Sequence, residues 1–245
     1  MSEIKRLLHD FKSFYNKLSN PKLVKLCIIF AHSIFLTGLL IGVIIAYLFG
    51  PESYNIWDNY ISDLGSFRYT PAPFILDTIA MMTAVLLVPI FFYLTKEILS
   101  NEFPIKLRSI ETLGKKLYRL IVFVLGILGF IALLFTVIGL FGIGLFSEDR
   151  TTQLGLHFLF SIVVFSGLAF AALFNGGAIL LKKTILPRLL GLYMMIGPFT
   201  ITIMFLFPPP PCTRPFIEWM MLFAAFLWLI PGAVVIFKKI VKDLK

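Results

Sequence analysis

Six strongly apolar runs alternate with short polar segments along the chain. The runs cover about residues 23–49, 74–94, 120–145, 154–181, 189–207 and 217–237. Each is long enough to cross the ~30 Å hydrocarbon core of a bilayer as a helix. The pattern therefore predicts an all-α integral membrane protein, a six-transmembrane-helix bundle that forms one membrane domain over residues 23–237.

Polar segments flank this domain at both ends. In residues 1–22, leucines and aromatic residues recur at helical spacing between basic residues, which predicts an amphipathic basic helix at the membrane surface. Residues 238–245 form a short basic tail. Composition agrees with the membrane assignment, because 59% of the residues are hydrophobic and only 14% are charged, against about 25% charged residues in soluble domains.

The net charge of +9 is distributed unevenly. All of the Lys and Arg residues except Arg68, Arg150 and Arg214 lie in residues 1–25, 96–119, 182–188 and 238–245. Basic residues collect on the cytoplasmic side of membrane proteins. We therefore expect cytoplasmic N and C termini in a plasma membrane, with membrane lipids and other membrane subunits as partner classes. The charge then needs no nucleic-acid partner, and no nucleic-acid-binding motif is present.

The first outer loop contains the segment Trp57-Asp58-Asn59-Tyr60-Ile61-Ser62-Asp63-Leu64-Gly65. At about 100° per residue, its aromatic and aliphatic positions share one face and its Asp, Asn and Ser positions share the other. Ser53 and Gly65 are typical residues for the start and the end of a helix. The segment therefore predicts a short amphipathic interfacial helix over residues 54–64.

Asp63 would lie in the last turn of this helix, where a carboxylate opposes the helix dipole. We expect it to need a partner, and the candidates are Arg68, Arg150 or a bound cation. The alternative is that Ser62 and Asp63 cap the following turn, as short polar side chains commonly do.

Further polar residues fall near the same membrane face. Asp77 and His157 lie about one turn inside the outer ends of the second and fourth spans, and ionisable residues at such depth usually face the bundle interior or a polar cavity. The candidate polar cluster comprises Ser62, Asp63, Asp77, Asp149, Arg150, His157 and Glu218.

Several chemistries remain open for this cluster. Asp63, Asp149 and His157, with Asp77, are suitable metal-ligand types, although no local ligand spacing supports a metal. An Asp that orients His157 would form an acid–base pair. A structural hydrogen-bond network needs neither. A Ser62–His157–Asp triad lacks the nucleophile-elbow sequence. The sequence assigns no catalytic residue and no cofactor.

Three segments, in this order, resemble motifs of a largely archaeal membrane family, the domain-of-unknown-function family number 998. They are the Ser62-Asp63-Leu64-Gly65 segment with Pro71–Asp77 after it, the Gly144–Asp149 segment with His157, and Phe216-Ile217-Glu218-Trp219. One departure is Asp77, where many members are expected to carry Asn. The resemblance implies a small polytopic protein of a prokaryotic plasma membrane and supplies no activity.

Three functions are compatible with these features. The first is binding of, or action on, a lipid headgroup at the outward-facing polar cluster. The second is a structural or accessory subunit of a membrane complex, in which the cluster only ties loops to the bundle. The third is a small transporter, which the sequence favours least because the cytoplasmic halves of the spans offer only His32 and Asn175 as a polar path.

Overall fold

The computed structural model describes residues 3–99 and 113–244. The start of the predicted basic segment, most of the predicted loop after the second span and the last residue of the basic tail lie outside the described residues. Within them the structure is all-helical. Its seven α-helices are α1 (Glu3–Leu18), α2 (Pro21–Phe49), α3 (Phe74–Leu99), α4 (Leu113–Leu145), α5 (Leu156–Leu181), α6 (Arg188–Leu206) and α7 (Arg214–Asp243).

Helices α2 to α7 are each long and apolar enough to cross a membrane. The prediction of six apolar helices is therefore confirmed. Helices α3, α4 and α7 extend beyond the predicted spans into segments that contain Lys and Glu. The apolar pattern ends earlier than the helix because charged residues such as Lys and Glu are themselves good helix formers.

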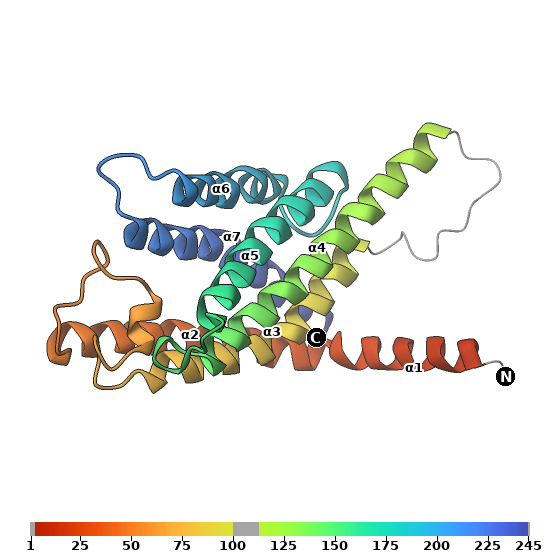
Figure 1. Cartoon of the computed structure of the whole chain (residues 1–245). Coiled ribbons are helices and arrows are strands. Elements are labelled where there is room, and N and C mark those ends of the chain that lie inside the picture. The colour runs from red at the N-terminus through yellow and green to blue at the C-terminus, as the bar shows by residue number, and fades with distance from the viewer. Residues whose placement is uncertain (1–2, 100–112, 245) are drawn as a thin grey trace.

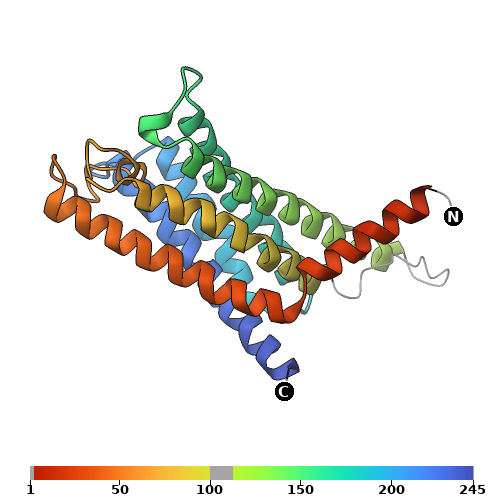
Figure 2. The same ribbon diagram turned by 90° about the horizontal axis from the view of Figure 1, so that it is seen from below.

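The six apolar helices form a ring in chain order, and α7 returns beside α2 (Figures 1 and 2). The contact between α2 and α7 is sparser than that between α2 and α3. Both termini lie at one end of the bundle (Figure 1). The opposite end carries the connections 50–73, 146–155 and 207–213, and we call it the loop end. At the terminal end, Lys239 of α7 donates to Glu97 of α3 at 2.6 Å.

Helices α4 and α5 pack closely through small residues. A Cβ atom at Gly139 would lie 2.5 Å from the backbone nitrogen of Val164, and one at Gly167 would lie 2.7 Å from Oγ1 of Thr136. Such small positions let membrane helices approach until their backbones are in van der Waals contact. This contact fixes the spacing of the helices that surround the bundle interior.

Helix α1 leaves the bundle at a bend before α2 (Figure 2). The Asn20 side chain accepts hydrogen bonds from the backbone N–H groups of Lys22 and Leu23 and so begins α2. The rings of Phe14 and Tyr15 contact Phe92 of α3. The predicted N-terminal helix is present, and its position on a membrane surface stays a prediction.

Gly139→Ala tests the close approach of α4 and α5. We expect the added methyl group to lower the free energy of unfolding by about 1–3 kcal/mol, because the neighbouring backbone cannot easily move. The control is Gly42→Ala in α2, where a Cβ atom would meet nothing within 4 Å; there a gain of up to about 1 kcal/mol is expected from helix propensity. Thermal unfolding in detergent, followed by tryptophan fluorescence, measures both. Equal melting temperatures for the two variants would contradict the packing.

Candidate functional site

The first loop, residues 50–73, does not contain the predicted helix over 54–64. The loop makes a turn around Trp57 and then a single turn of 3₁₀ helix, η1 (Ser62–Gly65). The reason is local. The Asn55 side chain accepts hydrogen bonds from the backbone N–H groups of Trp57 and Asp58, at 2.9 and 3.0 Å. Such side-chain bonds compete with the helical hydrogen-bond pattern, and here they replace it.

The predicted faces of this segment are also wrong. Asp63 and Asn59, which the helical pattern placed on the water-facing side, are buried. Trp57, which the same pattern placed on the apolar face, is 41% exposed. Helix α7 holds the loop over the bundle: the Trp219 ring N–H donates to the carbonyl of Asn59 at 3.2 Å, and the Thr213 hydroxyl donates to the carbonyl of Trp57.

Asp63 opposes no helix dipole, because it lies in the first turn of η1. Its Oδ2 atom accepts the backbone N–H of Tyr60 at 2.8 Å. The Asn59 side chain approaches the same atom at 3.4 Å. This local capping is the alternative that the sequence left open.

The side-chain partner of Asp63 is a second carboxyl group, Glu148, in the short helix η2 (Glu148–Arg150). The expected basic partners are engaged elsewhere: Arg68 pairs with Glu52 at 2.9 Å, and Arg150 pairs with Asp77 at 2.7 Å. Glu148 directly precedes Asp149 and Arg150 in the sequence and could be expected near the cluster for that reason, but it was not among the candidate residues.

One proton must sit between Asp63 and Glu148 for them to hydrogen-bond. Partial removal of its carboxyl group from water raises the pKa of Glu148 to about 7, and the charge of Asp63 adds to this shift. Burial also raises the pKa of Asp63, although less strongly, because backbone and side-chain hydrogen bonds favour its ionised form. Glu148 is therefore the proton donor of the pair and Asp63 the acceptor.

Asp149 and Arg150 fasten the loops to each other and to α3. Asp149 accepts the Ser66 hydroxyl at 2.8 Å and the Phe67 backbone N–H at 2.6 Å. Arg150 donates to Asp77, near the start of α3, and to the carbonyl of Gly144 at 2.9 Å. Buried or half-buried charges are stabilised when each finds such a partner. These contacts define a structural network.

His157 lies at the start of α5, and its Nδ1 atom is 2.8 Å from the carbonyl oxygen of Phe146. Its Nε2 atom is buried without a hydrogen-bond partner among the described residues. Among the described residues, no hydrogen bond joins His157 to Ser62 or to a carboxylate. The geometry therefore gives no support to the triad or to the Asp–His acid–base pair.

Glu218 lies in the second turn of α7, and the backbone N–H groups of Ile61 and Ser62 lie close enough to interact with its carboxyl group. Asp63 and Glu148 are close enough to interact with it electrostatically. The structure thus brings Ser62, Asp63 and Glu218 together with Glu148.

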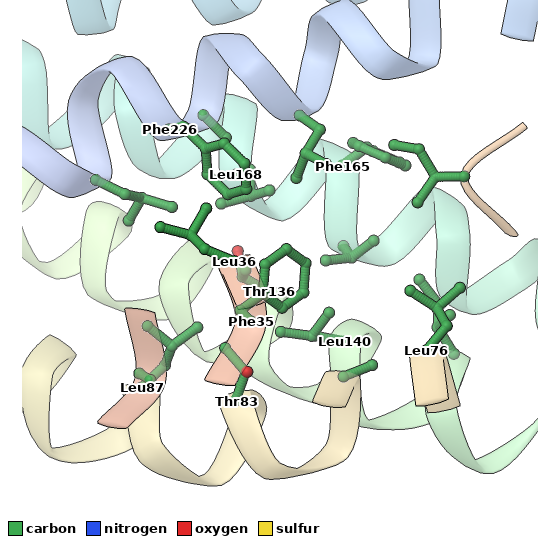
Figure 3. Close-up of a pocket in the computed structure, with 18 of the residues that line it drawn as sticks. Phe35, Leu36, Leu76, Thr83, Leu87, Thr136, Leu140, Phe165, Leu168 and Phe226 are labelled. Atoms are coloured by element: carbon green, nitrogen blue, oxygen red, sulfur yellow. The ribbon is translucent and has the colours of Figure 1, made fainter. Parts of the chain in front are cut away.

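Beneath this loop lies a partly open cavity of about 120 Å³, lined by residues of α2, α3, α4, α5 and α7. Its wall is almost wholly aliphatic and aromatic, as Figure 3 shows. The labelled apolar residues of the wall are Phe35, Leu36, Leu76, Leu87, Leu140, Phe165, Leu168 and Phe226. A smaller cavity of about 20 Å³ shares the wall residues His32, Leu87 and Leu229 with it and continues toward the terminal end.

The polar groups of the cavity wall are few and unevenly placed. Ser62, Ser161 and Glu218 line its loop end. Thr83 and Thr136 line its middle (Figure 3). Thr136 donates to the carbonyl of Ala132, whereas Thr83 Oγ1 is buried without a hydrogen-bond partner among the described residues. Nothing in the sequence singled out the two threonines, because single hydroxyl groups in apolar spans usually bond within their own helix.

The metal interpretation finds no support in the described residues, where no group of three or more His, Cys, Asp or Glu side chains is placed to hold an ion. Asp63, Asp149 and His157 each bond to different protein groups.

The fold defines the class of the protein: it is an all-helical, multi-pass membrane protein. No protein-family model matches the chain, and no curated protein or solved structure matches it significantly.

Replacing Glu148 tests the carboxyl pair. The folded state retains protons that the unfolded chain releases between about pH 4.5, the ordinary pKa of Glu, and about pH 7. It thus binds more protons in this window, and stability falls as the pH rises through it. Because the Glu148 side chain is itself exposed, screening limits the change to about 1 kcal/mol.

We expect Glu148→Gln, which cannot ionise, to flatten this pH dependence. Glu52→Gln, on the same side of the bundle but outside the pair, should keep the slope of the unmodified protein. Melting temperatures measured in detergent below and above the window decide the question, and an unchanged slope in Glu148→Gln would exclude the shared proton.

Proposed function

We propose that this protein binds a membrane amphiphile, with the apolar chain of the ligand in the central cavity and its polar group at the loop end. The observation that carries the proposal is the polarity of the cavity. Its wall is apolar along most of its length and ends at Ser62, Ser161 and Glu218. This distribution matches a molecule that has an apolar chain and one polar end.

The size of the cavity supports an apolar occupant. An engineered apolar cavity of about 150 Å³ stays dry and takes up benzene, and the volume here is comparable. The smaller cavity beyond His32 prolongs the apolar space toward the terminal end. A linear chain suits two such spaces in a row better than a compact ring does.

A route into the cavity from the lipid is available between α2 and α7. Leu36 of α2 lines the cavity and is also 39% exposed on the surface of the bundle. The contact between α2 and α7 is the sparse one in the ring. A lipid chain that enters at this seam stays in an apolar environment throughout.

The proposal includes an orientation. The segments that are rich in Lys and Arg lie at the terminal end, so we place the termini in the cytoplasm and the loop end outside a plasma membrane. The resemblance of the loop segments to the domain-of-unknown-function family number 998 is compatible with this placement and adds no activity.

An accessory subunit remains the alternative, and one observation favours it. Asp77, Asp149 and Arg150 all bond to protein groups, as expected for residues that only fasten loops. The two functions differ in what the cavity holds, since a purely structural role leaves its contents irrelevant.

Ala225→Phe tests the cavity. Ala225 is buried in α7 and lines the cavity. The added ring competes with the ligand at a steric cost of about 1–3 kcal/mol, and we expect about tenfold weaker lipid binding. Lipids that co-purify with the protein in mild detergent are quantified by mass spectrometry.

The matched control is Val234→Phe, on the same helix but 45% exposed to the outside of the bundle. It should retain the lipid content of the unmodified protein. If both variants melt at similar temperatures and carry equal amounts of lipid, the amphiphile proposal fails and the accessory role is favoured.

The orientation is tested with Cys212, which lies partly exposed in the last loop of the loop end, whereas Cys27 is buried in α2. A membrane-impermeant maleimide should label Cys212 in intact spheroplasts, and Cys212→Ser should abolish the labelling. The control combines Cys212→Ser with Leu244→Cys in the C-terminal tail, which should react only after permeabilisation. The reverse pattern would invert the topology.

A further inference from the structure

The charges around the polar end of the cavity are of one sign. Among the described residues that line the cavity, only Glu218 and His32 have ionisable side chains, and Glu218 is the acidic one. The groups that interact with it electrostatically, Asp63 and Glu148, are acidic as well and share one proton. A ligand group at this end of the cavity therefore meets carboxylates.

The basic residues nearby form ion pairs with other carboxylates, although the charge of Arg68 also acts on Asp63 and Glu148. Arg150 is paired with Asp77, and Arg68 is paired with Glu52. Arg214, at the start of α7, is exposed, and none of the ion pairs among the described residues joins it to Glu218. Among the described residues, Glu218 at the polar end of the cavity thus has no paired basic side chain.

An independent observation indicates that the cavity is built for a ligand with polar atoms. Thr83 is only 6% exposed, and its Oγ1 atom lines the cavity without a hydrogen-bond partner among the described residues. Figure 3 shows Thr83 among apolar side chains. Most buried side-chain polar atoms in proteins have a partner in the protein or in ordered water. A bound molecule that accepts or donates a hydrogen bond below its terminal group would satisfy this hydroxyl.

We propose that the amphiphile bound by this protein carries a cationic polar group, such as the ammonium of a long-chain amine, next to Glu218. This inference depends on the proposed function and names its ligand class. An ammonium donates to Glu218 and to the Ser62 and Ser161 hydroxyls while it neutralises the carboxylate. A carboxylate or phosphate at the same place would add like charge in a site of low polarity, which disfavours its binding.

The test uses three probes with the same saturated chain: hexadecylamine, hexadecanol and hexadecanoic acid. The full-length protein is purified in neutral detergent at a mildly alkaline pH at which the amine is protonated and the acid is ionised. Each probe is titrated at the same mole fraction of the micelle, and bound adducts are counted by native mass spectrometry. We expect the amine to bind about tenfold more tightly than the alcohol, and the acid to bind most weakly.

Glu218→Gln removes the charge and retains an acceptor for the backbone N–H groups of Ile61 and Ser62. In this variant the amine should lose its preference and bind as the alcohol does. The matched control is Asp58→Asn, which removes an exposed carboxylate of the same loop outside the cavity wall and should leave the order of the three probes unchanged. The order of the probes on the unmodified protein is decisive even if Glu218→Gln does not fold.

The outcomes separate the two proposals. Equal binding of the three probes, or tightest binding of the acid, would overturn the cationic headgroup and leave the amphiphile-binding function standing, provided that Ala225→Phe weakens all three. Absence of saturable binding by any probe would overturn both. Amine binding that Glu218→Gln reduces and Asp58→Asn does not would support both.

Discussion

The site depends on the contact between the start of α7 and the backbone of the first loop. The backbone N–H groups of Ile61 and Ser62 lie close enough to interact with the Glu218 carboxyl group, which offsets part of the cost of placing this group at the edge of an apolar bundle. The same contact lays η1 across the end of the cavity and makes Ser62 part of its wall. Asp149 holds the loop from the opposite side through Ser66 and Phe67.

The helices were predictable because a membrane-spanning helix depends mainly on the run of residues that forms it. A membrane-spanning helix must satisfy its backbone internally and present apolar side chains to lipid, so a run such as that of α2 is visible in the sequence without knowledge of its neighbours. The ends were less predictable. Helix α4 begins at Leu113, before its apolar run starts, because polar helix-forming residues continue the helix beyond the lipid-facing part.

The first loop and the cavity were not predictable in the same way. Helical periodicity over residues 54–64 was real, but the Asn55 side chain bonded to the backbone and formed a turn instead. The partner of Asp63 was sought among basic residues, although its partner is Glu148. The cavity forms where the side chains of five helices leave space between them. The Thr83 hydroxyl draws attention only in the structure, where it has no hydrogen-bond partner among the described residues. Neither the cavity nor the environment of the Thr83 hydroxyl can be inferred from the spacing of residue types along the sequence.

Glu218 therefore belongs to both parts of the loop end: it contacts the loops, and it lines the cavity in which we propose that the ligand binds. An experimental density map of the unmodified protein, purified in its native lipid environment, tests most directly whether the cavity has an occupant. We predict elongated density that begins beside Ser62 and Glu218 and extends past Thr83 toward His32. A cavity that is empty, or filled by side chains from α2 and α7, would contradict amphiphile binding.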